Sequence, residues 1–237
     1  MMCGHEITHP FTGILTLYTY FRSSCSCRVR TACHLKNIPL QFKYINLLSA
    51  EQTSPLYLSE INPNGTVPTL LIHSSTGALL GKITQSLSIL EFLEETFPSP
   101  EYVSLLPPPS QWLERAKVRD LVALVACDMQ PPTNLRILKQ VNPLGITNQA
   151  WFAENMAKPV AAYEEVLVQT AGKYSVGDEI SLADVCLAPA IENAVRWEVD
   201  LSKYPTVLRV FENSRRVEAF VKGDWRHQED TPEGLRG

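Results

Sequence analysis

The sequence predicts an α/β domain followed by an all-α domain, and three observations support this fold class. Segments with strand-like and helix-like patterns alternate through the first 97 residues. Residues 98–110 contain five prolines, a composition typical of a linker. After residue 110 the apolar residues recur at helical spacing and no convincing strand follows. We therefore divide the 237 residues into an α/β domain at 1–97, a proline-rich linker at 98–110 and an all-helical domain at 111–237.

The α/β domain begins with a βαβ unit. Residues 1–12 look like a leader, and the apolar run at 14–20 predicts a buried first strand. Residues 25–36 have helical spacing, and Asn37-Ile38-Pro39 ends that helix. Residues 41–47 alternate as a second strand does. Two strands joined in this way are expected to be parallel, with a right-handed crossover.

The domain continues with a hairpin and a helix. Residues 49–61 are polar and predict a loop with a short helix. Strands are predicted at 70–72 and 77–84, with a short turn between them that favours an antiparallel hairpin. A further helix starts at Gln85-Ser86 and ends at Pro98. The predicted order of elements is therefore β-α-β-α-β-β-α.

The helical domain shows two apolar helix faces and one strong helix start. The faces consist of Leu113, Ala116, Leu121, Leu124 and Val125, and of Trp151, Met156, Val160, Tyr163 and Leu167. Further along, Ser181 is a good N-cap, and Asp184 occupies the capping-box position three residues later. Because this pair satisfies N–H groups at the helix end, we assign it a structural role and not a catalytic one.

The composition disfavours several classes of protein. A formal net charge of -4, from 21 basic and 25 acidic side chains, gives no electrostatic footprint for nucleic acid. No apolar run approaches the roughly 20 residues that span a membrane, and residues 1–10 lack the apolar centre of a secretory signal. We expect a cytoplasmic protein whose six cysteines are reduced. Cys25 and Cys27 form a C-x-C pair without a second pair, so no metal site is predicted.

Residues 22–30 point to an anion site at the start of the first helix. They read Arg-Ser-Ser-Cys-Ser-Cys-Arg-Val-Arg and lie where the first strand turns into the helix. The first N–H groups of a helix have no intrahelical partner and carry the positive end of the helix dipole. Ser23 or Ser24 can cap the helix and also point a hydroxyl at a bound thiolate, which a helix N-terminus favours. On these residues alone, two serines that merely cap a helix remain the commoner explanation.

Five motifs in order make the sequence resemble the zeta class of glutathione transferases, the maleylacetoacetate isomerase family. They are Ser-Ser-Cys-Ser-x-Arg-Val-Arg at 23–30, Asn-Pro-x-Gly-x-Val-Pro-Thr-Leu at 62–70, Gln-Ser-Leu at 85–87, Gly-Asp-Glu-Ile-Ser-Leu-Ala-Asp at 177–184 and Asp-Thr-Pro-Glu-Gly-Leu-Arg at 230–236. One motif is moderate support, and all five together are highly specific. The resemblance covers nearly the whole chain. It implies the glutathione transferase architecture, a thioredoxin-like domain with a mixed four-stranded sheet followed by an all-α domain.

The resemblance implies glutathione as the cofactor and assigns its site. Ser23 would carry the hydroxyl nearest the glutathione sulfur, with Ser24 and Cys25 beside it as catalytic positions. A cis peptide bond is implied between Val67 and Pro68, which would aim the Val67 backbone at that of glutathione. The other implied glutathione contacts are Gln52, Gln85, Ser86, Gln130 and Asn134. Without the resemblance, Gln85-Ser86 is typical of an ordinary helix cap.

Two arginines are the implied substrate contacts. Arg196 matches the family arginine that faces the active site from the helical domain, and a guanidinium suits an acid because it binds a carboxylate with two hydrogen bonds. Arg28 has two interpretations of equal weight. It contacts the substrate, or it is part of a solvated group with Arg22 and Arg30.

The resemblance implies isomerisation as the reaction. The glutathione thiolate would add to the cis double bond of maleylacetoacetate, from phenylalanine and tyrosine catabolism, and leave after rotation. The alternatives are conjugation or dehalogenation of small electrophilic acids, thiol transfer through Cys25 or Cys27, and a non-catalytic scaffold with the same fold. The family usually has Trp at the position of Cys27. A smaller side chain there is expected to widen the pocket or to leave a second thiol near Cys25.

The resemblance also implies a homodimer. The helix after Gln85 of one subunit would pack on the first helices of the other subunit's helical domain. Residues 87–97 carry apolar side chains on more than one face, and residues 121–126 form an almost unbroken apolar run. A twofold contact between identical surfaces would bury this surplus, although the core of a monomer explains it as well.

Overall fold

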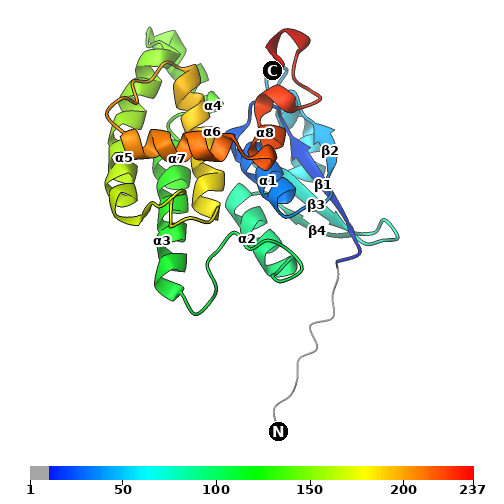
Figure 1. Ribbon diagram of the computed structural model, residues 1–237. Coiled ribbons are helices and arrows are strands. Elements are labelled where there is room, and N and C mark those ends of the chain that lie inside the picture. The colour runs from blue at the N-terminus through cyan, green and yellow to red at the C-terminus, as the bar shows by residue number, and fades with distance from the viewer. Residues whose placement is uncertain (1–10) are drawn as a thin grey trace.

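The computed structural model describes residues 11–237, which form a small sheet joined to a larger group of helices (Figure 1). Most of the leader predicted at residues 1–12, and Cys3, lie outside the described residues. Within residues 11–237, no helix is both long and apolar enough to cross a membrane. The five cysteines of this part of the chain are all free thiols.

The sheet has four strands in the order β2-β1-β3-β4. The strands are β1 at Ile14–Thr19, β2 at Gln41–Tyr44, β3 at Thr69–His73 and β4 at Leu79–Ile83. β1 pairs with β2 in parallel and with β3 antiparallel, and β3 and β4 form the antiparallel hairpin. The mixed sheet, the parallel first pair and the hairpin are therefore confirmed. β2 ends before residue 47, where we expected it to end, because its partner β1 stops at Thr19, opposite Tyr44.

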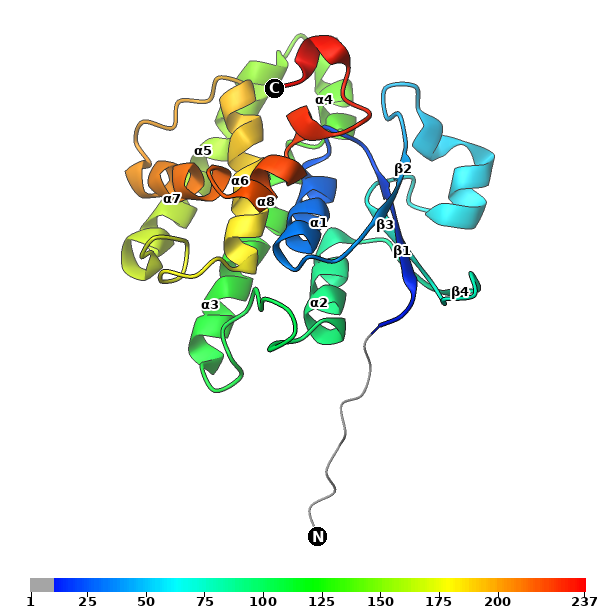
Figure 2. The same cartoon turned by 45° about the vertical axis from the view of Figure 1, so that its right-hand side comes forward.

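Two helices lie between the sheet and the helical domain (Figure 2). They are α1 at Ser24–Leu35 and α2 at Ser86–Thr96. Between β2 and β3 the chain forms short turns of helix at Glu51–Thr53 and Tyr57–Ile61, where we expected a loop and a short helix. Because α1 packs against α2 on one side and against α6 and α8 of the helical domain on the other, it belongs to the cores of both parts.

The second part of the chain is helical. Its helices are α3 at Trp112–Ala123, α4 at Leu135–Val141, α5 at Asn148–Thr170, α6 at Leu182–Arg196, α7 at Pro205–Arg215 and α8 at Glu218–Gly223, with short helical turns at Leu124–Met129, Asn142–Leu144, Trp225–His227 and Glu233–Leu235. Residues 97–111 are all described and contain turns and bends without a helix or strand. The domain boundary at residues 98–110 stays a proposal.

Helix α6 is the centre of the helical part, and its start is the predicted capping box. Ser181 Oγ accepts a hydrogen bond from the Ala183 N–H, and Asp184 Oδ2 accepts one from the Ser181 N–H at 2.9 Å. Asp184 Oδ1 also accepts from the Ser175 N–H at 2.8 Å, which ties the preceding loop to the helix start. The structural role predicted for Ser181 and Asp184 is therefore confirmed.

The predicted apolar face of the first helix after the linker is partly wrong. Leu113 and Ala116 are exposed, and the buried face consists of Val118, Leu121, Val122 and Val125. This face is buried because α3 and the turn that continues it pack against α5 and α6. Part of the apolar run at residues 121–126 is thus core of this chain, as the alternative to the dimer predicted.

A buried ion pair ties α1, α2 and the linker together. Lys36 Nζ lies 2.8 Å from Glu94 Oε1 and donates to the Val103 carbonyl oxygen at 2.6 Å. The side chains of Lys36 and Glu94 are 0% and 8% exposed, so water does not replace either partner. Glu94 also accepts from the Leu105 N–H at 3.1 Å and from the Ser104 hydroxyl at 3.1 Å. The path of residues 103–105 is therefore fixed by one carboxylate.

Candidate active site

A cavity of about 420 Å³ lies between the two parts of the chain. Its size is in the range usual for small-molecule sites. Its walls come from the β1–α1 loop, residues 47–67, the segment from Gln130 to α4, and the end of α6. We call it the cleft.

The start of α1 forms one wall of the cleft. Ser23 is the N-cap, with extended backbone, and its hydroxyl oxygen accepts from the Ser26 N–H at 3.1 Å. This bond uses an oxygen lone pair and leaves the Ser23 O–H free to donate. Ser24 and Cys25 are the first helical residues, whose N–H groups have no intrahelical partner. Ser23 therefore caps the helix, and both serines line the cleft, so the two interpretations of this stretch are compatible.

The cleft brings together eight of the residues that the sequence assigned to the site. They are Ser23, Ser24, Cys25, Gln52, Val67, Gln130, Asn134 and Arg196. They come from four separate stretches of the chain, which only the fold places side by side. Pro68, Gln85, Ser86 and Arg28 are outside the lining of the cleft.

Ser86, Gln85 and Arg28 lie together at the start of α2. Gln85 is the N-cap of α2, but its side chain makes no capping bond and is exposed. The Ser86 hydroxyl oxygen, which is buried, accepts from Arg28 Nη1 at 3.2 Å. The first N–H groups of α2 therefore keep no side-chain cap, and an ordinary cap at Gln85 is excluded.

The solvated arginine group predicted for residues 22, 28 and 30 is wrong. Arg28 is 2% exposed and Arg30 is fully buried. Arg30 donates to the Gly223 and Phe21 carbonyl oxygens at 3.0 and 3.1 Å, so it joins α1 to the C-terminal segment. Arg28 also does not reach the cleft, so contact with the substrate is not supported by this geometry. Helical spacing alone could not reveal these burials, because the covering residues lie far along the chain.

A tight loop presents Val67 to the cleft. Gly65 has a φ of +61°, and a Cβ there would lie 3.2 Å from the Gln52 carbonyl oxygen, so the close approach favours glycine. Asn62 Nδ2 donates to the Thr66 carbonyl oxygen at 2.9 Å and holds the loop from inside. The peptide bond between Val67 and Pro68 is cis, as the resemblance implied.

Gln130 and Asn134 lie on the helical wall, where the chain enters α4. Asn134 is the N-cap of α4, and its side-chain oxygen accepts from the Arg136 N–H at 3.0 Å. The amide NH₂ of Asn134 is thus left as a donor on the wall of the cleft. Trp151 Nε1 donates to the Pro132 carbonyl oxygen at 2.8 Å, which fixes the segment between Gln130 and Asn134.

The charge of the cleft is entirely positive. Arg22, Arg136, Lys139 and Arg196 line it, and no aspartate or glutamate is among its lining residues in the described part of the chain. Burial, and next the charge of Arg22, lowers the pKa of Arg196. Two guanidinium groups in one cleft repel each other, and an anion between them removes the repulsion. The cleft is therefore built for an anionic ligand.

Several residues that line the cleft were not predicted from the sequence. Arg136 and Lys139 of α4, Trp197 after α6, and Tyr20 before the serines all line the cleft. Burial raises the pKa of Tyr20, which keeps its hydroxyl neutral and able to donate. Arg196 stacks over the ring of Trp197 at 4.7 Å, which holds the guanidinium without neutralising it. The one available signal was the pair Arg136 and Lys139, two and five residues after Asn134.

Cys27 lies outside the cleft, which corrects two expectations. It lines a separate cavity of about 200 Å³ among α1, α6 and the C-terminal segment, and its sulfur lies 3.8 Å from the Thr31 hydroxyl. Burial raises the pKa of the Cys27 thiol. A small residue at this position therefore does not widen the cleft, and it adds no second reactive thiol beside Cys25.

Comparison with known proteins agrees with this geometry. Residues 22–96 match the family described as Glutathione S-transferase, N-terminal domain, and residues 152–218 match Glutathione S-transferase, C-terminal domain. Maleylacetoacetate isomerase maiA of Aspergillus fumigatus is 48% identical over 94% of this chain and 95% of its own. The chain therefore belongs to the glutathione transferase family.

Two solved structures identify the class within this family. A maleylacetoacetate isomerase from Anaeromyxobacter dehalogenans 2CP-1, with dicarboxyethyl glutathione and citrate bound in its active site, has a TM-score of 0.82 at 33% identity, over 94% of this chain and 96% of that one. A bacterial maleyl pyruvate isomerase of the zeta class has a TM-score of 0.81 at 33% identity, over 92% and 100% of the two chains. The resemblance to the zeta class that the five motifs predicted is confirmed.

Proposed function

We infer that the protein is a glutathione-dependent cis–trans isomerase of maleylacetoacetate or a closely similar unsaturated dicarboxylic acid. One observation supports this most directly: the cleft joins a helix start that favours a thiolate to four cationic side chains and, among residues 11–237, to no acidic one. The relatives named as maleylacetoacetate isomerases agree with this inference.

The glutathione side of the cleft has donors where a peptide thiolate needs them. Glutathione, when bound, supplies a thiolate that adds reversibly to the double bond, so that the bond can rotate before the thiolate leaves. The free O–H of Ser23 and the N–H groups at the start of α1 stabilise negative charge on sulfur. Val67, Gln52 and the uncapped start of α2 are the positions we propose for its backbone and carboxylates.

The acid side of the cleft holds the substrate. Arg196 and Arg22 converge on the same space and can each bind a carboxylate with two hydrogen bonds. Negative charge that develops on the substrate oxygen during addition is stabilised by the Arg196 guanidinium, which Trp197 holds in place before the reaction. Tyr20 adds a neutral O–H donor to this wall.

Conjugation of small electrophilic acids is the second candidate, since it uses the same cleft. It is favoured by the relative from Anaeromyxobacter, in which dicarboxyethyl glutathione is bound. The two reactions differ in the fate of glutathione, which is regenerated in isomerisation and consumed in conjugation.

The deciding experiment measures turnover with glutathione far below the substrate concentration. We expect many turnovers of cis to trans maleylacetoacetate per glutathione, with the glutathione concentration unchanged at the end. Stoichiometric loss of glutathione would support conjugation instead. No turnover, together with no glutathione binding by calorimetry, would support the scaffold and contradict both enzymatic functions.

We also propose that the protein is a cytoplasmic homodimer that acts in tyrosine catabolism. Apolar side chains at the edge of α2 and at the start of α3 support the dimer: Leu87 and Phe92 are half-buried, and Trp112 is 71% exposed. Such exposed apolar surface on two neighbouring helices favours contact with a second copy. Sedimentation at micromolar concentration tests the dimer, and a single species near 26.5 kDa would contradict it.

A further inference from the structure

The last motif of the sequence, at residues 230–236, has no part in the proposed chemistry. It nevertheless contacts the loop between β1 and α1, which lines the cleft. Figures 1 and 2 show the C-terminal segment (red) beside the end of β1 and the start of α1 (blue). Asp230 Oδ2 accepts a hydrogen bond from the Phe21 N–H at 2.9 Å. Phe21 directly precedes Arg22 and Ser23, so this contact fixes the backbone of the loop that enters the cleft.

Arg22 is held by aromatic rings. Its guanidinium lies 5.2 Å from the ring centre of Phe21 and 5.2 Å from that of Trp225. Nε of Arg22 is buried and has no hydrogen-bond partner within residues 11–237. A carboxylate partner would neutralise the guanidinium and occupy its N–H groups, whereas an aromatic face does neither. This arrangement keeps a fixed cation available for an incoming anion.

Trp225 is itself held in place by its neighbour Arg226. Arg226 lies 4.4 Å from the centre of the Trp225 ring, and it pairs with Glu192 of α6 and, at 3.1 Å, with Asp224. Glu192 is four residues before Arg196 in the same helix, so one helix supports both sides of the acid site.

The segment that carries Asp230 is also held together by hydrogen bonds within it. Gln228 Nε2 donates to the Asp224 and Lys222 carbonyl oxygens at 2.7 and 2.8 Å, and the Thr231 hydroxyl donates to the Trp225 carbonyl oxygen. Arg236 closes the segment by donating to the Thr231 carbonyl oxygen at 3.0 Å. It therefore packs against the loop as a formed unit.

We propose that residues 224–236 are a C-terminal clamp that positions Arg22 for the acidic substrate, with Trp225 and Asp230 as its positioning residues. Trp225 does not line the cleft, so it acts through Arg22. The clamp rests on the proposed function, because it requires that Arg22 bind a carboxylate. It gives the C-terminal motif a role in substrate affinity that is separate from glutathione binding.

The main test is a set of steady-state measurements on the full-length chain with Trp225→Ala, Trp225→Phe, Arg22→Ala and the double variant Arg22→Ala/Trp225→Ala. Loss of a partly desolvated cation–π contact corresponds to about a threefold to thirtyfold change. We expect Trp225→Ala to raise KM for the acid by this factor, with kcat and KM for glutathione within about twofold of the wild type. Trp225→Phe keeps a ring face and should restore most of the affinity.

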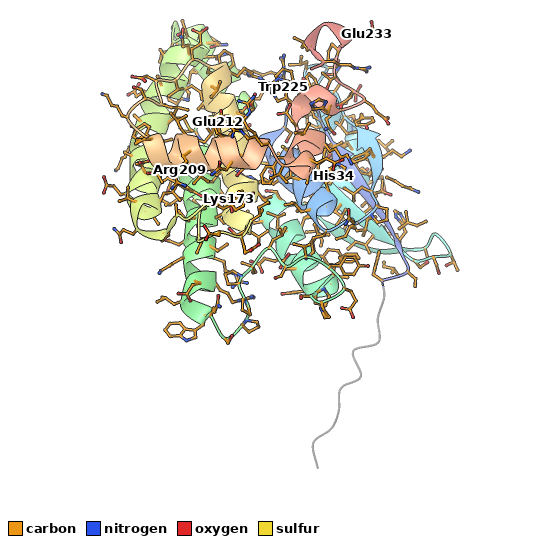
Figure 3. The ribbon with its side chains drawn as sticks, viewed as in Figure 1. His34, Lys173, Arg209, Glu212, Trp225 and Glu233 are labelled. Atoms are coloured by element: carbon orange, nitrogen blue, oxygen red, sulfur yellow. The ribbon has the colours of Figure 1, made fainter. Side chains whose placement is uncertain are left out.

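The double variant distinguishes positioning from general packing. If Trp225 acts through Arg22, adding Trp225→Ala to Arg22→Ala raises KM for the acid no further. Multiplied effects of the two substitutions would overturn the clamp. Lys173→Ala is the matched control, because it removes a cation–π contact of 5.2 Å with Tyr174 outside the cleft. Figure 3 shows Lys173 well apart from Trp225, and this variant should change neither KM.

Two further readouts keep the clamp and the proposed function separate. Hydrogen exchange at the Phe21 amide should become about tenfold faster in Asp230→Ala, since the acceptor of that N–H is removed. Unchanged exchange would contradict the clamp. If Arg196→Ala raises KM for the acid and Arg22→Ala does not, the proposed function stands and the clamp is refuted. If neither raises it, the acid site itself is wrong.

Discussion

Replacing Glu94 with alanine should strongly destabilise the protein, because it leaves the Lys36 ammonium buried without a counter-charge. The side chain of Lys36 is 0% exposed, and after the substitution only the Val103 carbonyl oxygen, at 2.6 Å, accepts from it. The Leu105 N–H loses its acceptor as well. Breaking a buried ion pair costs about 3–5 kcal/mol. For a chain of this length that lowers Tm by roughly 6–20 °C.

Urea unfolding and calorimetry of Glu94→Ala measure this loss directly. Glu91→Ala is the control, since Glu91 pairs with Arg119 at 3.0 Å but the two side chains are 38% and 45% exposed, and an exposed pair contributes about 0–1 kcal/mol. The double variant Lys36→Met/Glu94→Gln keeps an acceptor for Leu105 and no buried charge, so it should recover most of the stability. A loss below about 1 kcal/mol in Glu94→Ala, or a double variant no better than the single one, would refute the reasoning.

Three further outcomes are expected. Ser23→Ala should lower kcat/KM about tenfold to hundredfold at neutral pH. The loss should be smaller above about pH 9, because a free thiol ionises there without help. Equal losses at both pH values would argue against a role of Ser23 in stabilising the thiolate. Arg196→Ala should raise KM for the acid by a larger factor than Arg196→Lys, because lysine keeps the charge but not the bidentate geometry, as substrate titrations would report. Burial, and next the charges of Lys222 and Arg30, lower the pKa of His34 below 6.5. The folded state therefore binds fewer protons than the unfolded state, and the free energy of unfolding falls as the pH drops through about 6.5. His34→Gln should remove this contribution to the difference in unfolding free energy between about pH 7.5 and about pH 5.5, measured in urea.

The sequence predicted best where the signal is local. The helix after residue 24, the parallel strand pair and the hairpin follow from periodicity, Asn37-Ile38-Pro39 and short turns, and the structure has each of them. The capping box of Ser181 and Asp184 was equally readable, since both partners lie within three residues.

Local patterns failed where distant residues decide the outcome. Arg28 and Arg30 look like surface charges on a polar helix, but Ser86 and the chain near Gly223 cover them. Leu113 fits an apolar face and is nevertheless exposed, because the buried residues of α3, which packs against α6, begin only at Val118. The four cationic side chains of the cleft were likewise not predictable as a group, because a charge on a helix surface and a charge in a cleft have the same sequence pattern.

Arg22 and Ser23 are neighbours in the chain, so their Cα atoms stay about 3.8 Å apart whatever the rest of the molecule does. Arg196 comes from the end of α6, in the other part of the chain. Trp225 and Arg226 link the loop of Arg22 to Glu192 of α6, so a movement of α6 would shift both arginines of the cleft together. A helical part transplanted onto another thioredoxin-like half would carry Arg196 and Trp225 along and leave Arg22 behind, so the proposed acid site requires both halves of this chain.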